Sequence, residues 1–177
     1  MAPLVLSVRP STPSGRVRIE GNSGASGSCR FCATPAKPQE PSSFLDADGA
    51  CAYCQLVRRL DRPSIDNEAV LIWLPELTQA ALIALVRECH ARLRHCGVQH
   101  LTERGSTAVL HGSVPIEARE ALAAIAAFRS RIAEVEARLG SSSPKALAQA
   151  MSRLNGKVYA DRARRLHGVR LMPLGHP

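Results

Sequence analysis

The pattern of apolar and polar positions predicts a short buried strand near the middle of the chain. Residues 69–74 (Ala-Val-Leu-Ile-Trp-Leu) form the most hydrophobic stretch. This run is short, partly β-branched, and bounded by residues 63–67 and by Pro75. An apolar run of this length between turn residues is typical of a buried strand. The preceding residues 55–60 favour a short helix or turn.

A helix is predicted directly after this strand. Thr78 is a favourable N-cap and Gly97 is a stop signal, so the helix should run to about Cys96. Its apolar face has spacings of three and four and comprises Leu82, Leu85, Val86, Cys89, Leu93 and Cys96. We interpret Cys89 and Cys96 as core residues, because cysteine is among the most buried residue types. His90 and His95 lie beside the stripe and are expected at the surface or its boundary.

The C-terminal half predicts further helices. One spans about residues 116–139, ends at Gly140, and has an apolar face of Leu122, Ile125, Phe128, Ile132, Val135 and Leu139. A third begins at Ser143-Pro144, because proline suits the first helical position. It should turn Leu147, Ala150, Met151 and Leu154 inward. A last basic helix covers about residues 159–166, and we expect disorder beyond Gly168.

These elements predict an α+β chain with four parts. Residues 1–28 are rich in Gly, Ser and Pro and form a flexible N-terminal segment, with a short strand indicated at residues 16–20. Residues 29–114 form the core and include an edge strand at 107–110. Residues 115–156 form a helical extension, and residues 157–177 form a basic, partly disordered tail.

Four cysteines form two closely spaced pairs, Cys29-x2-Cys32 and Cys51-x2-Cys54, with 18 residues between them. This spacing matches the pattern of a tetrahedral zinc site, against the alternatives of paired disulfides or unrelated buried thiols. Four thiolates fill the coordination shell of zinc, so one such ion is structural. Residues 33–50 have the composition of a loop, and we expect metal ligation to order them.

The charge of the chain is uneven. The formal net charge is +8, and residues 143–177 carry seven Lys/Arg against the single acidic residue Asp161. A basic segment of this kind binds nucleic acid, anionic lipid or an acidic partner, or is a solvated end. No secretory signal and no transmembrane segment are expected, and thiols spaced for a metal fit a reducing compartment. We therefore expect a cytoplasmic location.

The cysteine pairs are followed by a distinctive segment, Leu71-Ile-Trp-Leu-Pro-Glu-Leu-Thr-Gln79, and an amphipathic helix. Together they resemble the IcmJ/DotN proteins of type IVB secretion and related conjugation systems. In that family a C-x2-C…C-x2-C zinc site precedes an L-I-x-L-P-E-[IL]-[TS]-Q motif. The similarity runs from about residue 28 to residue 93, with weaker agreement over residues 129–154.

The resemblance implies a fold and a function. The fold is a small HNH-like, treble-clef-type zinc unit with a short β element, followed by a predominantly helical extension. The implied function is that of a non-enzymatic adaptor in the coupling complex, with the type IV coupling ATPase and other subunits as partners. The protein is then recruited to the inner membrane through the secretion complex, without inserting into the membrane itself.

No catalytic residue is expected. An HNH-type nuclease needs a histidine to activate water and further groups to hold a second metal, normally between the cysteine pairs. Residues 33–50 contain neither histidine nor asparagine, and the carboxylates of Asp46 and Asp48 are expected to be solvated. The alternative is an HNH-derived nucleic-acid-binding protein, with residual nuclease activity, that uses the basic tail. The low aromatic content offers little surface for base stacking.

Overall fold

The computed structural model describes residues 3–8, 27–35, 45–46, 48–98 and 115–175. The expected strands at residues 16–20 and 107–110 lie outside this part of the chain. The described elements are α1 (Ala52–Arg58), α2 (Ile65–Glu68), β1 (Ala69–Trp73), α3 (Gln79–His95), α4 (Ile116–Arg129), α5 (Ile132–Leu139), α6 (Pro144–Ser152), α7 (Gly156–Ala160), α8 (Arg162–Arg165) and β2 (Val169–Pro173). Among them no helix has the length and apolar character needed to cross a bilayer.

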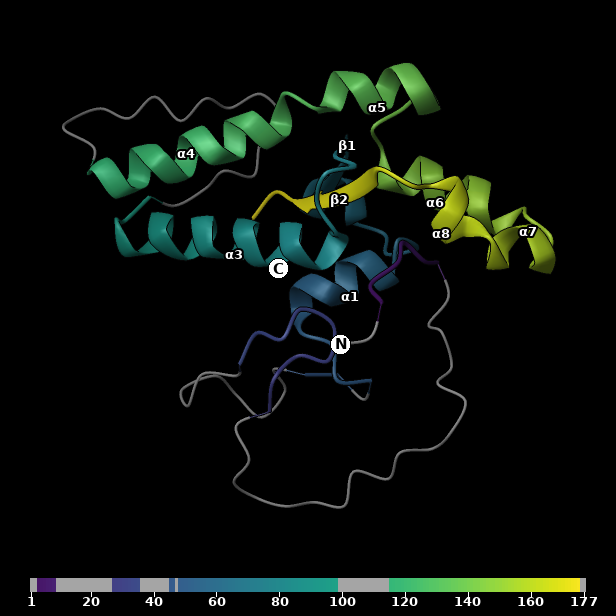
Figure 1. The fold of residues 1–177 in the computed structure, drawn as a ribbon, viewed down its shortest axis with the longest axis horizontal. Coiled ribbons are helices and arrows are strands. Elements are labelled where there is room, and N and C mark those ends of the chain that lie inside the picture. Colours follow the sequence, from purple (N-terminus) through teal and green to yellow (C-terminus); the bar gives the residue numbers. More distant parts are fainter. Residues whose placement is uncertain (1–2, 9–26, 36–44, 47, 99–114, 176–177) are drawn as a thin grey trace.

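A two-stranded antiparallel sheet lies at the centre of the molecule (Figure 1). β1, which the sequence predicted, pairs with β2 so that Leu71 lies opposite Leu171. The side chain of Gln79 secures this pair, since its Nε2 donates to the Leu171 carbonyl and its Oε1 accepts from the Leu171 amide, each at 2.8 Å. The expectation of disorder beyond Gly168 is therefore wrong for residues 169–175.

The sheet is covered on both faces, which explains why β1 is uniformly apolar. Alternate side chains of a strand point to opposite faces. On one face Val70, Ile72 and Met172 join a core with α3 and α4. On the other, Leu71 and Leu171 join a core with α1, α6 and the four paired cysteines. The cysteine-bearing segments are thus anchored to the centre of the fold.

Helix α3 begins as predicted, because the Thr78 hydroxyl accepts a hydrogen bond from the Ala81 amide at 3.2 Å. The predicted apolar face is wrong at Leu85, whose side chain is 46% exposed. It is also incomplete, because His90 is buried and lies toward α1. Two buried sides are needed because α3 packs against α4, β2 and α1.

The single helix expected over residues 116–139 is wrong, since the structure has two helices separated at Ser130–Arg131. The carbonyl of Arg131 accepts a hydrogen bond of 3.2 Å from the Trp73 amide. It thus provides a hydrogen-bond acceptor at the edge of β1 that is not paired with β2. A straight helix would not place that carbonyl at the sheet edge, and the bend lets α5 cover β1 while α4 lies along α3 (Figure 1). Gly140, with φ of 75°, ends α5 as predicted.

Helix α6 starts at Ser143 as predicted, but it buries Ala148 and Met151 and leaves Leu154 39% exposed.

The segments near both ends of the chain differ from the prediction. The basic helix is divided into α7 and α8 at Asp161. The N-terminal segment is not wholly flexible, because Ser7 exchanges backbone hydrogen bonds of 3.0 Å with Val57 and Leu60. Residues near both termini therefore pack beside α1.

Candidate metal centre

The first cysteine pair lies on a tight turn. Ser28 and Pro35 form an antiparallel bridge, and the amide of Cys29 donates to the Thr34 carbonyl at 2.8 Å. The chain reverses at Ala33, which has a φ of 56°. The x2 spacing within such a turn lets both thiols face the same side of the chain.

The second pair lies at the start of α1. Cys51 is the N-cap residue and Cys54 lies in the first turn of the helix. Cys51 is also bridged to Leu45, and its amide lies 3.4 Å from Cys29 Sγ, so it contacts the first pair directly. The helix thus presents two thiols toward the turn that carries the other two.

The four thiols converge on one point. All four Sγ atoms lie within 4.8 Å of one another, and Cys32 and Cys51 are 3.7 Å apart. Four thiolates at about 2.3 Å from a tetrahedral zinc ion would be separated by about 3.8 Å. A disulfide would need about 2.05 Å, and all six cysteines are free. The group is therefore positioned to hold one metal ion.

The four thiols are shielded from solvent. The exposed fractions of the ligand candidates are 1% for Cys29, 8% for Cys32 and 0% for both Cys51 and Cys54. A set of four thiolates satisfies a tetrahedral ion, with no position left for water or substrate. The arrangement suits a structural ion rather than a catalytic one.

The thiols strongly perturb one another. Hydrogen bonds from Cys32, Cys51 and Cys54 lower the pKa of Cys29. The hydrogen bond with Cys29 raises the pKa of Cys32, but contacts with Cys51 and Cys54 outweigh it and bring the value to about 6. The pKa values of Cys51 and Cys54 are raised, chiefly by their hydrogen bonds to Cys29 and Cys32. A cation is what would let all four thiols ionise together.

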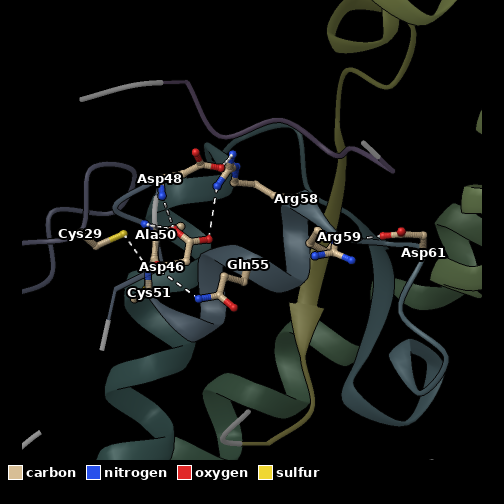
Figure 2. A network of polar contacts seen from close by, with 9 residues as sticks. All are labelled: Cys29, Asp46, Asp48, Ala50, Cys51, Gln55, Arg58, Arg59 and Asp61. Carbon is tan, nitrogen blue, oxygen red and sulfur yellow. Dashed lines mark hydrogen bonds and ion pairs between the residues drawn. The ribbon is translucent and has the colours of Figure 1, made fainter. Parts of the chain in front are cut away.

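A polar network surrounds the second pair (Figure 2). The Asp46 carboxylate accepts hydrogen bonds from the amides of Asp48 and Ala50, at 3.0 and 2.8 Å. Arg58, from the last turn of α1, pairs with both aspartates. The expectation that these two carboxylates are merely solvated is therefore wrong. No local pattern indicates this contact, because Arg58 lies 10 residues beyond Asp48.

The other cysteine and histidine side chains within the described ranges do not join the metal group. Cys89 is buried on α3, and burial raises the pKa of its thiol, as expected for a core residue. Cys96 is only half-buried, at the end of that helix. His90 Nδ1 lies 3.3 Å from the hydroxyl of Tyr53, so its burial belongs to the contact between α3 and α1. The expectation that His90 lies at the surface or its boundary is therefore wrong.

Comparison with known proteins adds no family to these observations: no protein-family model matches the chain, and no curated protein matches it.

Proposed function

We propose that the chain is a non-enzymatic adaptor whose fold is held together by one structural zinc ion. It acts in the coupling complex of a type IVB secretion or conjugation system, where it binds the coupling ATPase and helps to recruit substrates. The observation that carries the structural role of the metal is the closed, buried group of four thiols. The assignment to a coupling complex rests on the IcmJ/DotN-like residues of the sequence.

Zinc is the ion that suits this donor set. Its filled d shell imposes no geometric preference, and it accepts four soft thiolates in a tetrahedral arrangement. The turn around Cys29 and the helix start at Cys51 would then be joined by the ion. This combination of a cysteine turn and a cysteine pair at a helix start supports the HNH-like, treble-clef-type unit that the resemblance implies.

The Leu-Pro-Glu motif has a structural role that fits this proposal. Leu71, Ile72 and Leu74 are buried in the two cores, Thr78 caps α3, and Gln79 binds β2. Glu76 differs, because its side chain is 57% exposed and lies 3.8 Å from Arg131. The motif residues thus form β1, the following turn and the start of α3, and family members that share the motif would share this core. The side chain of Glu76 remains accessible to a partner.

A non-enzymatic role is supported by the surroundings of the thiols. The carboxylates of Asp46 and Asp48 are engaged by Arg58 and by backbone amides, so they are not arranged to hold a second, hydrolytic metal. The purified protein should therefore not cut DNA or RNA in the presence of Mg²⁺, Mn²⁺ or Zn²⁺. Cleavage that co-purifies with the protein and disappears in an Asp46→Asn/Asp48→Asn variant would contradict this role.

The alternative role in nucleic-acid binding depends on free basic side chains in the C-terminal segment. Two arginines there donate to backbone carbonyls within the chain, Arg162 to Leu6 at 3.1 Å and Arg170 to Leu77 at 2.6 Å. Arg164 and Arg165 pair with Asp161, but their side chains are 80% and 55% exposed. The anchoring of Arg162 and Arg170 reduces the basic surface that nucleic acid could contact and so favours the adaptor, while Arg164 and Arg165 remain accessible.

The helical extension supplies the surface that we assign to the ATPase. The face of α4 turned away from α3 is exposed at Ala123, Ala126 and Ala127, and Ile116 at its start is 59% exposed. Small side chains let a helix or an extended segment of a partner approach closely. The ATPase contact would bring this cytoplasmic protein to the inner membrane.

Affinity capture from the native bacterium, read by mass spectrometry, tests the proposal. The tagged wild-type chain should recover the coupling ATPase together with other coupling-complex subunits. An Ala126→Glu variant places a charge on the exposed α4 face and should lose the ATPase. The matched Ala84→Glu variant, at an exposed position of α3, should retain it. Recovery of DNA-processing proteins without the ATPase would instead support the nucleic-acid-binding alternative.

A further inference from the structure

Arg58 joins three segments around the metal centre, and Figure 2 shows its contacts with the acidic turn. It lies in the last turn of α1, and only 8% of its surface is exposed. Its Nη2 donates to Asp48 Oδ2 at 2.5 Å, and its Nη1 lies 3.6 Å from Asp46 Oδ2. Its Cζ also lies 4.8 Å from the centroid of the Phe31 ring. A single guanidinium thus holds an acidic turn and an aromatic side chain against one helix.

Each of these contacts leads to a thiol of the metal group. Phe31 lies between Cys29 and Cys32 in the first turn. The acidic turn ends at Ala50, directly before Cys51, and the carbonyl of Gly49 accepts from the Arg30 amide at 2.9 Å. Helix α1 itself carries Cys54. Arg58 is therefore linked to both cysteine pairs through covalently adjacent residues.

Charge gives a second reason for an arginine here. A zinc ion with four thiolates has a formal charge of −2, and Asp46 and Asp48 add two further negative charges. Their side chains are only 32% and 27% exposed, so solvent screens this repulsion incompletely. A planar guanidinium can contact two carboxylates at once and remains charged at any accessible pH. Arg58 thereby offsets the acidic turn beside an anionic metal site.

We propose that Arg58 is a positioning residue for the metal. It holds the acidic turn and the first cysteine turn in register with α1, so that the four thiols keep the spacing that retains the ion. This inference rests on the zinc site of the proposed function. Residues that orient metal ligands without touching the metal typically change metal affinity by about 10- to 100-fold when they are replaced.

Zinc release from the zinc-loaded 177-residue protein to an excess of the chromogenic chelator 4-(2-pyridylazo)resorcinol tests this role. Arg58→Met keeps the apolar stem and removes the charge. It should bind zinc about 10- to 100-fold more weakly, and should therefore release it faster than wild type. Arg58→Lys keeps the positive charge but lacks the planar guanidinium, so its rate of zinc release should lie between those of wild type and Arg58→Met. Arg59→Met is the matched control, since Arg59 is exposed and pairs only with Asp61 at 3.4 Å among the described residues. It should release zinc at the wild-type rate.

Two further measurements separate positioning from general stabilisation. The cobalt-loaded Arg58→Met protein should keep the absorption spectrum of a tetrathiolate site, because the ligands are unchanged, but it should need more Co²⁺ to reach it. In excess zinc its melting temperature should stay close to that of wild type. A lowered melting temperature in excess zinc combined with a wild-type release rate would show a purely structural role and overturn the proposal.

The result is decided even if Arg58→Met fails to fold. Arg58→Gln keeps an amide that can still donate to Asp48 while it removes the positive charge and the planar fork, and it should also accelerate release. Wild-type release rates in both Arg58→Gln and Arg58→Lys would overturn the positioning role. Wild-type protein that holds no zinc would overturn the metal site itself, whereas one zinc per chain with unchanged release in the variants would overturn only the role of Arg58.

Discussion

Gly168 shows how closely the chain approaches itself beside the sheet. It has a φ of 88°, and a Cβ at this position would lie 2.6 Å from a ring carbon of Trp73. Its carbonyl accepts a hydrogen bond of 2.7 Å from the Leu74 amide. Arg138 stacks on the same ring, with its Cζ 4.0 Å from the ring centroid. Glycine is required here for conformation and for space.

Replacing Gly168 by alanine should therefore cost more than a matched change at Gly140. Gly140 has a φ of 75° but nothing within 4 Å of an added Cβ. Gly140→Ala should cost about 1–2 kcal/mol, which is the penalty of the left-handed conformation alone. Gly168→Ala adds overpacking against Trp73 and should cost about 1–3 kcal/mol more. Urea denaturation of both variants measures the difference, and equal costs would show that the close approach to Trp73 is absent.

At the scale of elements, β2 is the segment on which the fold depends most unexpectedly. Val169, Leu171, Met172 and Leu174 are each no more than 3% exposed, and they complete the cores on both faces of β1. The amide and carbonyl of Leu171 also satisfy the buried side chain of Gln79. Loss of the strand would leave these polar groups and the apolar faces of β1 unpartnered.

Deleting residues 169–177 should therefore unfold the chain. The milder Leu171→Ala change should cost about 2–5 kcal/mol, as is typical of a buried leucine. Circular dichroism and thermal melting report both effects. A cooperative, wild-type melting curve for the 169–177 deletion would mean that β2 is dispensable.

Elements with local signals were predictable from the sequence, and those made by distant contacts were not. The cap at Thr78, the stop at Gly140 and the Ser-Pro start of α6 each follow from chemistry within one turn. β2 was missed because it is five residues long, follows a basic run, and pairs with a strand about 100 residues earlier. The break at Ser130–Arg131 could not be predicted, because no proline or glycine marks it in the sequence. It coincides with the hydrogen bond that the Arg131 carbonyl accepts from the distant Trp73 amide.

The candidate site shows the same division. The spacing of the four cysteines predicted that they would meet, because the x2 pairs and the 18-residue separation constrain their geometry. The spacing contains no information about Arg58, which reaches the acidic turn only once α1 has formed. The burial of His90 was also not predictable. The apolar periodicity of α3 indicates a single buried face, whereas other elements pack against two faces of this helix.

At the scale of the whole molecule, metal binding should couple the fold to pH. Metal-bound thiolates have depressed pKa values relative to about 8.5 in an unfolded chain, so the stability they provide is present at higher pH and is lost as pH falls. In the metal-free cluster the pKa of Cys29 is lowered and that of Cys32 is about 6, while those of Cys51 and Cys54 are raised. Binding at pH 7 should therefore displace the protons of Cys51 and Cys54.

Zinc competition titrations between pH 5 and 8 measure this coupling. The logarithm of the affinity should rise by about two per pH unit above pH 6, and by about three below it, where the Cys32 proton is also displaced. A Cys96→Ser variant should give the same slopes, since Cys96 is not part of the group. An affinity that does not change over this range would exclude thiolate ligation.

The claim on which the account depends most is that Cys29, Cys32, Cys51 and Cys54 hold one zinc ion per chain. Native mass spectrometry of the purified protein tests it directly, with Cys51→Ser and the chemically matched Cys96→Ser as variants. We expect one zinc per chain for wild type and for Cys96→Ser, and loss of zinc and of thermal stability for Cys51→Ser. A Cys51→Ser protein that keeps its zinc and melts like wild type would contradict it.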